Sequence, residues 1–183
     1  MKKIAISALV LIWISGPALF AGQNEKGLWS AVKNEKLGQV VYYLAQGAEC
    51  DSLDKLGATP LHWAAMVGNH KIALLLLKKG ANPQASRERI SKPLILAAMS
   101  GSVDCVKNLL KYDKDISSPN QQGDTALHEA IRSKHIQITR LLLEAGAHPN
   151  LANGDGITPL QRAQATKNEE LIALVKLYIQ QYE

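Results

Sequence analysis

Aromatic residues and cysteines are scarce in this chain. Aromatic side chains make up 5% of the 183 residues, with one phenylalanine, and there are two cysteines. The paired-cysteine pattern of a structural zinc site is missing. Five histidines are present, but none stands in a His-Glu-x-x-His arrangement. The sequence therefore predicts no metal site and no cofactor.

Catalytic motifs are missing as well. Ser100-Gly101-Ser102 lacks the frame of a nucleophile elbow. Asn153-Gly154-Asp155-Gly156 lacks the alternating acidic ligands and the closing glutamate of a calcium loop, and is better explained as a turn. We therefore predict that the chain is not an enzyme.

The charge balance excludes another class of partner. The formal net charge is +5, and it falls to +3 when Lys2 and Lys3 are left out. The other basic residues are scattered among acids, whereas a nucleic-acid footprint needs a basic stripe. Arg87-Glu88-Arg89 is the densest basic spot and is best explained as a solvated loop tip. We expect no nucleic-acid partner.

Long apolar runs are limited to the first segment, Ile4 to Ile14, which follows Lys2-Lys3. With small residues at Ala18 and Ala21, residues 1–21 have the pattern of a signal peptide. Cleavage after either alanine fits. The alternative, an uncleaved membrane anchor, is disfavoured because the run is shorter than the roughly 20 apolar residues that a span needs. We predict a periplasmic protein, or alternatively a secreted one, without membrane contact once this segment is removed.

A four-residue pattern recurs with a period of 33 residues: 59–62, 92–95, 125–128 and 158–161. The clearest copy is Thr59-Pro60-Leu61-His62. Gly-Ala pairs at 47–48, 80–81 and 146–147 keep the same register. A fixed period of this size is typical of a stacked repeat.

These motifs resemble the ankyrin repeat, and the resemblance extends from about Glu25 to Glu183. It implies an all-α solenoid of about five helix-turn-helix units with short β-hairpin fingers. The ankyrin domain would span 22–183, with units at about 22–50, 51–83, 84–116, 117–149 and 150–183. The third unit is the most degenerate, since Lys92, Ile95 and Ile90 replace threonine, histidine and the turn glycine.

The residues of the pattern have structural roles. Thr59, Thr125 and Thr158 suit helix N-caps, and Pro60 suits the first helical position. Gly80 and Gly146 suit the helix C-terminus, where glycine adopts a positive φ easily. The resemblance implies that His62 and His128 bridge neighbouring fingers by hydrogen bonds.

The two cysteines fall in different units. Cys105 matches core positions of a second helix, and Cys50 matches a partly buried slot before a finger. Stacked units lie about 10 Å apart, whereas a disulfide needs Cα atoms within about 7 Å. We predict two buried free thiols.

The resemblance also implies that the fingers and first helices form a concave partner-binding face. Its N-terminal half is apolar and its C-terminal half is polar. The residues that the register places there are Lys55, Leu56, Ala58, Trp63, Met66, Val67, Glu88, Arg89, Leu96, Met99, Ser100, Gln121, Gln122, Asp124, Glu129, Arg132 and Asp155. An apolar patch beside polar groups fits a protein interface. The alternative is that Trp63 and Leu96 pack between helices and expose little.

The resulting hypothesis is a monomeric, non-catalytic protein-binding module of the kind found among exported bacterial ankyrin proteins. Two roles follow from that resemblance. One is an immunity protein that neutralises a toxin such as a lipase effector. The other is an accessory protein that assists an enzyme such as a catalase against oxidative damage. A third class is a secreted protein that acts on a host cell.

Overall fold

The computed structural model describes residues 16–86 and 90–182. Within them the chain forms ten helices and no strand of more than one residue. The helices are α2 (Gly16–Lys33), α3 (Leu37–Ala45), α4 (Pro60–Met66), α5 (His70–Lys78), α6 (Pro93–Ser100), α7 (Val103–Leu110), α8 (Ala126–Arg132), α9 (Ile136–Glu144), α10 (Pro159–Ala165) and α11 (Glu169–Tyr182).

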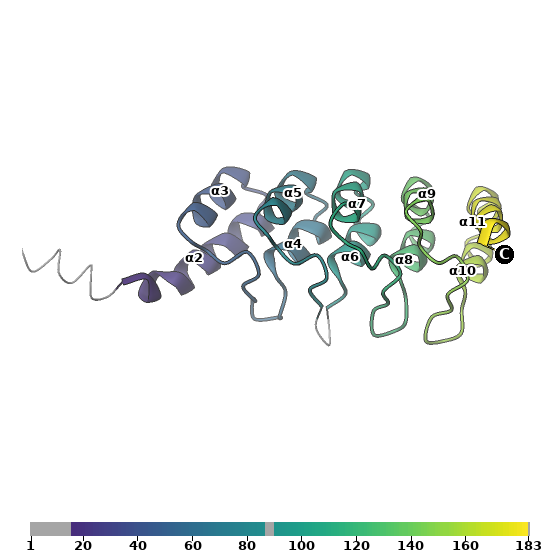
Figure 1. The fold of residues 1–183 in the computed structure, drawn as a ribbon, viewed down its shortest axis with the longest axis horizontal. Helices are drawn as coiled ribbons and strands as arrows, with labels where there is room; N and C mark the ends of the chain where they lie inside the picture. Colours follow the sequence, from purple (N-terminus) through teal and green to yellow (C-terminus); the bar gives the residue numbers. More distant parts are fainter. Residues whose placement is uncertain (1–15, 87–89, 183) are drawn as a thin grey trace, which may run out of the picture.

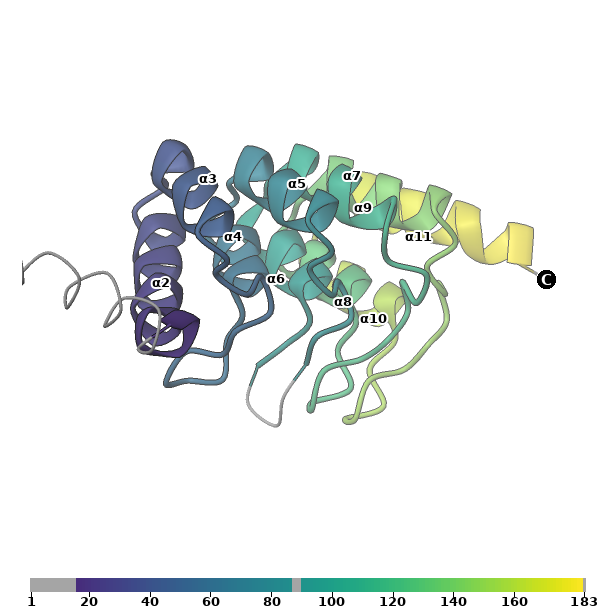
Figure 2. The same ribbon diagram turned by 60° about the vertical axis from the view of Figure 1, so that its left-hand side comes forward.

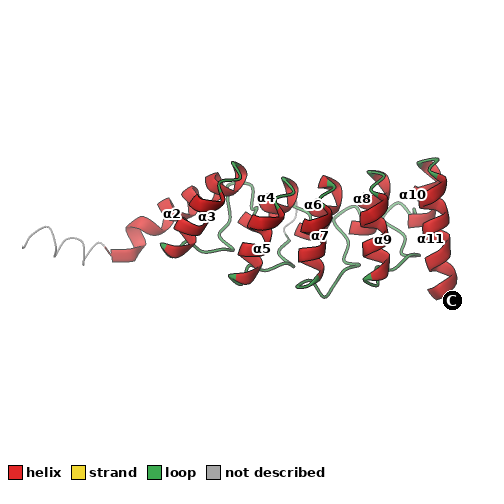
Figure 3. Ribbon diagram, turned by 90° about the horizontal axis from the view of Figure 1, so that it is seen from above, coloured by secondary structure: helices red, strands yellow, loops and turns green. Residues whose placement is uncertain are grey.

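The ten helices stand as antiparallel pairs side by side along one axis (Figures 1 and 3). The first helices of the pairs form one layer, next to the finger loops, and the second helices form the other layer (Figure 2). Each helix packs against its pair partner and against the corresponding helix of the next pair. The predicted all-α solenoid is confirmed.

The first helices begin where the repeated pattern predicts. Thr59, Thr125 and Thr158 each accept a hydrogen bond from the backbone of the third helical residue, whose side chain accepts one from the threonine amide in return. In the third unit Lys92 takes the N-cap position without a side-chain bond. The capping box thus holds in three units, and the third lacks it because lysine has no acceptor to offer.

The core consists of small and branched side chains between the two helical layers. Leu61, Ala64 and Ala65 are fully buried, as the helical spacing predicts. Both thiols are free, which agrees with the prediction. Cys105 is fully buried, as predicted, and burial raises its pKa to about 12. Cys50 was also predicted to be buried but is only half-buried. Cys105 therefore serves as a small apolar core residue.

The fingers close through side-chain turns. Asp54, Asn120 and Asn153 each accept bonds from the amides two and four residues further on, at 2.8 to 3.0 Å. These side-chain bonds add to a backbone bond of 2.9 Å across each of the three turns. Ile90 is the only described residue in an extended bridge. The matching position of the third finger is Arg87, which lies outside the described residues.

The first helix begins earlier than the repeat pattern predicts. We expected the first unit to start near residue 22, but α2 runs without interruption from Gly16 to Lys33. Residues 1–15 of the predicted signal peptide lie outside the described residues. No helix in the described part of the chain is both long enough and apolar enough to cross a membrane.

The two buried histidines, His62 and His128, should make the stability of the solenoid depend on pH. Burial lowers the pKa of His62 and of His128 below the ordinary value of 6.5. As the pH falls, the unfolded chain therefore takes up protons before the folded chain does. We expect the free energy of unfolding to be level above about pH 6.5 and to decline below it.

Urea unfolding between pH 7.5 and pH 5 measures this decline. Glutamine is the suitable replacement for each histidine, because this chain already uses it at the same position of the fifth unit. There the Gln161 side-chain oxygen accepts from the Thr158 amide at 2.8 Å, where the other caps use a histidine nitrogen. The variant His62→Gln with His128→Gln should keep both caps and show a shallower decline than the wild type. Equal declines in the two proteins would show that His62 and His128 do not cause the loss of stability at low pH.

Candidate protein-binding face

An apolar hollow lies on the finger side of the second and third units. Its volume is about 360 Å³. Helices α4 and α6 contribute its side chains together with the fingers that precede them. The lining residues are Leu56, Ala58, His62, Trp63, Met66, Ile90, Ser91, Leu96 and Met99. Most were predicted for the N-terminal half of the concave face, and the stacking of two units brings them together.

The exposed walls of this hollow are aliphatic. Leu56 is 69% exposed, Met66 45% and Met99 42%, and Val67 beside them is also exposed. Methionine side chains are flexible and polarisable, so they adapt to irregular partner surfaces. The exposed patch is thus apolar and deformable.

Trp63 is a fixed wall of the hollow rather than a free anchor. Its indole N–H donates to Asp54 at 2.8 Å, and the Lys33 ammonium lies 3.9 Å from its ring centre. Both Trp63 and Leu96 are half-buried and pack against the core. The alternative interpretation of these two residues is therefore partly correct, because they expose less than the methionines.

Asp54 connects the finger to this wall. Burial alone would raise its pKa, but hydrogen bonds from the Ala58 amide, the Trp63 indole and the Leu56 amide outweigh burial and lower it. Lys33 adds an ion pair at 3.2 Å. The ionised carboxylate therefore holds the Trp63 ring, the finger and α2 in one arrangement.

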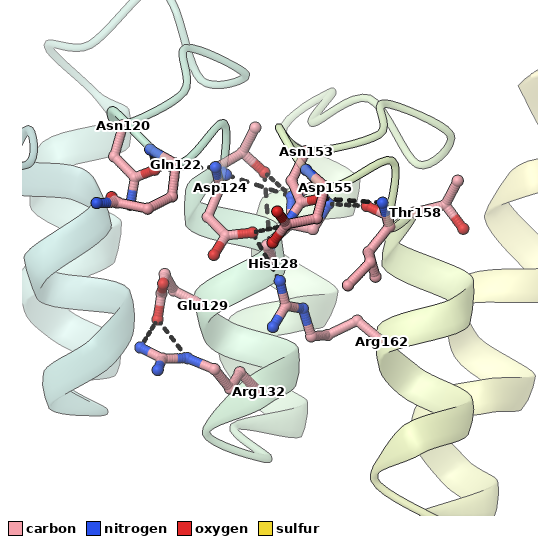
Figure 4. Close-up of polar contacts among 12 residues, drawn as sticks. Asn120, Gln122, Asp124, His128, Glu129, Arg132, Asn153, Asp155, Thr158 and Arg162 are labelled. Carbon is pink, nitrogen blue, oxygen red and sulfur yellow. Dashed lines mark hydrogen bonds and ion pairs between the residues drawn. The ribbon is translucent and has the colours of Figure 1, made fainter.

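The polar half of the face is largely occupied by contacts within the chain. Asp124 lies between Arg162 and Asn153 (Figure 4), with bonds of 2.8 Å and 2.7 Å to its Oδ1. Both partners come from the fifth unit, so this cluster ties the last two units together. Asp124 was predicted to face a partner, but its side chain is 13% exposed and already paired.

Two further predictions for this face need correction. Glu129 is buried and paired with Arg132, which also donates through Nε at 2.9 Å (Figure 4). The guanidinium remains exposed, but the carboxylate is not available to a partner. Ala58 is 5% exposed, so it forms the floor of the hollow and offers no side chain.

Other predicted positions have mixed outcomes. Four of them, Ser100, Gln121, Gln122 and Asp155, are exposed as predicted. Glu88 and Arg89 lie outside the described residues. Of the predicted finger bridges, His128 makes one at 3.1 Å to the Ile157 carbonyl. His62 faces the next finger, where the Ala85 backbone acts to raise its pKa, but its Nε2 has no hydrogen-bond partner within bonding geometry among the described residues.

A second groove, of about 780 Å³, lies at the N-terminal end of the face and was not predicted. Trp29 forms part of its lining and donates to the Ser52 carbonyl at 3.3 Å. The lining residues are Lys26, Trp29, Ser30, Lys33, Asn34, Leu53, Asp54, Lys55 and Leu56. The spacing of Lys26, Trp29 and Lys33 along one helical face was the signal in the sequence.

The described residues contain no cluster of three or more histidine, cysteine, aspartate or glutamate side chains placed to hold a metal ion.

Comparison with known proteins identifies the repeat. A family model for ankyrin repeats in three copies matches residues 28–120 and 81–153. The E3 ubiquitin-protein ligase KEG of Arabidopsis thaliana is 31% identical over 137 residues, which are 73% of this chain and 8% of that protein. The mouse ankyrin repeat and SOCS box protein 11 is 34% identical over 106 residues, 58% of this chain and 32% of that protein.

The mouse RelA-associated inhibitor is 38% identical over 91 residues, 48% of this chain and 11% of that protein. The chain spans at most about a third of the length of these relatives. The resemblance therefore concerns the repeats and not the whole proteins. The matched residues, the helix pairs and the capping boxes agree that the chain belongs to the ankyrin-repeat family.

Proposed function

We propose that this chain is a non-catalytic module that binds another protein through the N-terminal half of its finger-side face. One observation carries the proposal: three aliphatic side chains, Leu56, Met66 and Met99, stand exposed around one hollow. Exposed apolar surface next to polar groups is typical of a protein interface. The proposed partner inserts an apolar side chain between α4 and α6.

The contrast between the two halves of the face supports this location. In the C-terminal half, Asp124 and Glu129 are paired with arginines of the same chain. A partner there would have to replace interactions that already exist, which adds a desolvation penalty. In the N-terminal half, apolar atoms are in contact with water, and their removal from water favours association.

We further propose that the module acts in the periplasm as an immunity protein that occludes a toxin. Residues 1–21 carry the pattern of an export signal. A rigid scaffold that presents one apolar hollow suits a blocking role, because a preformed surface loses little conformational entropy on binding. The accessory role beside an oxidative-stress enzyme is the alternative.

Affinity capture from periplasmic extract, followed by mass spectrometry, tests this function. A captured toxin whose activity falls on addition of this protein would support immunity. Capture of a peroxide-degrading enzyme whose activity is preserved would favour the accessory role. Failure of the tagged protein to reach the periplasm would overturn the proposed location. A deletion strain that is no more sensitive to the captured toxin than its parent would overturn the immunity role.

A further inference from the structure

Lysine side chains gather at the N-terminal end of the finger-side face. Lys26, Lys33 and Lys55 line the second groove, with the Trp29 indole and the exposed side chains of Leu53 and Leu56 between them. The groove therefore combines cations with exposed apolar surface.

The charge of this groove is not balanced by its own acids. Asp54 is the only carboxylate among the described residues that line it. Its side chain is 6% exposed and is occupied by Lys33, the Trp63 indole and two amides of the finger. In the described part of the chain, neither Lys26 nor Lys55 has a carboxylate within ion-pair distance.

Two other acids of the first unit contact the second unit. Glu35, two residues after α2, accepts from the Asn69 side chain at 3.0 Å. Asp51, at the start of the first finger, accepts from the Asn82 amide at 3.0 Å. Both carboxylates therefore stabilise the contact with the second unit, and neither forms an ion pair with a lysine among the described residues.

The basic groove and the apolar hollow are contiguous. Leu56 lines both of them, and Trp63 and Lys33 form the boundary, since the Lys33 ammonium lies over the Trp63 ring. A single extended segment crossing Leu56 would contact the lysines with one part and the methionines with another.

We propose that the partner docks an acidic segment in this groove, with an adjacent apolar side chain in the hollow. This inference rests on the proposed protein-binding function and specifies the chemistry of the partner. Carboxylates complement Lys26 and Lys55, and complementary charge selects partners and orients them as they approach. The ammonium groups of Lys26 and Lys55 are point charges, and they pair with carboxylates without the bidentate geometry that an arginine fork imposes.

Peptide display on the immobilised 183-residue chain tests the inference. We expect random dodecamers selected by the protein to be enriched in aspartate and glutamate next to leucine, methionine or an aromatic residue. One selected peptide, made synthetically and labelled with fluorescein, then serves as the probe in a titration. Selection of apolar peptides without acids would overturn the inference but would leave the proposed function standing.

Charge reversal locates the contact. The variant Lys26→Glu with Lys55→Glu should bind the probe at least about tenfold more weakly at 50 mM salt, and the difference should shrink at 300 mM salt. The control is Lys71→Glu with Lys78→Glu, which makes the same change of charge on exposed positions of α5, in the other helical layer. Equal binding of the probe by the two variants would overturn the assignment of the acidic segment to the groove of Lys26 and Lys55.

Binding to lipid vesicles must be compared with binding to the peptide, because lysines around a tryptophan also suit an anionic lipid surface. We expect no binding to vesicles of phosphatidylcholine and phosphatidylglycerol in a 3:1 ratio. Vesicle binding that is lost in Lys26→Glu with Lys55→Glu, while peptide binding is unchanged, would assign the groove to lipid and overturn the inference.

Discussion

Replacement of Met66 and Met99 together by glutamate is expected to abolish capture of the partner while the solenoid stays folded. Both side chains line the apolar hollow and are 45% and 42% exposed, so glutamate fits at each position in the free protein. In the complex the carboxylates would lose their water without gaining a partner. A loss of about 2 kcal/mol or more is expected at an interface hot spot, which is roughly a 30-fold weaker complex.

Val41→Glu with Leu177→Glu is the matched control for this variant. These residues are 50% and 49% exposed, and they lie on α3 and α11, in the layer away from the fingers. The control carries the same added charge and should capture the partner as well as the wild type does. Circular dichroism verifies the fold of both variants. Capture that persists in the methionine variant would place the partner on another surface.

Substitution of Gly123 by alanine is expected to destabilise the C-terminal units strongly. Gly123 has a φ of +79°, and a Cβ atom there would lie 2.2 Å from the Gly154 nitrogen in the next finger. That nitrogen donates to the Gln122 carbonyl at 2.8 Å, so it cannot move away without breaking the contact between the two fingers. Positive φ costs about 1–2 kcal/mol for alanine, and the clash should add about 1–3 kcal/mol.

Gly156→Ala separates these two effects. Gly156 has a similar φ of +76°, but nothing lies within 4 Å of the position that a Cβ atom would occupy. This variant should lose only the backbone contribution. Urea unfolding of both variants measures the difference, and equal losses would show that the two fingers are not held in close contact at Gly123.

Much of the scaffold could be predicted from sequence because the signals that define it are local. The threonine caps at Thr59, Thr125 and Thr158 need only a donor three residues away. The buried positions follow the helical period, as Leu61, Ala64 and Ala65 illustrate. The start of α2 was less predictable, since the repeat register places the first unit near residue 22, whereas the helix begins at Gly16.

The candidate site was predicted less completely. The register placed Met66, Val67 and Met99 on the exposed face, and they are exposed. The register also placed Asp124 and Glu129 on that face, because a repeat pattern shows which way a side chain points but not which partner it meets. Glu129 pairs with Arg132 of the same helix, and Asp124 pairs with Arg162 of the next unit. Pairing across units depends on side-chain reach, which a single repeat pattern does not encode.

The sequence by itself determined the period of 33 residues, the helix starts at the threonine caps and the alternation of buried and exposed positions, because each depends on residues within one unit. The tertiary structure decided which charges remain free. Stacking brings Arg162 to Asp124 and Lys33 to Asp54, so these groups neutralise each other. It leaves Lys26 and Lys55 without a carboxylate among the described residues. Distances between units determine those pairings, and they exist only once the units have stacked.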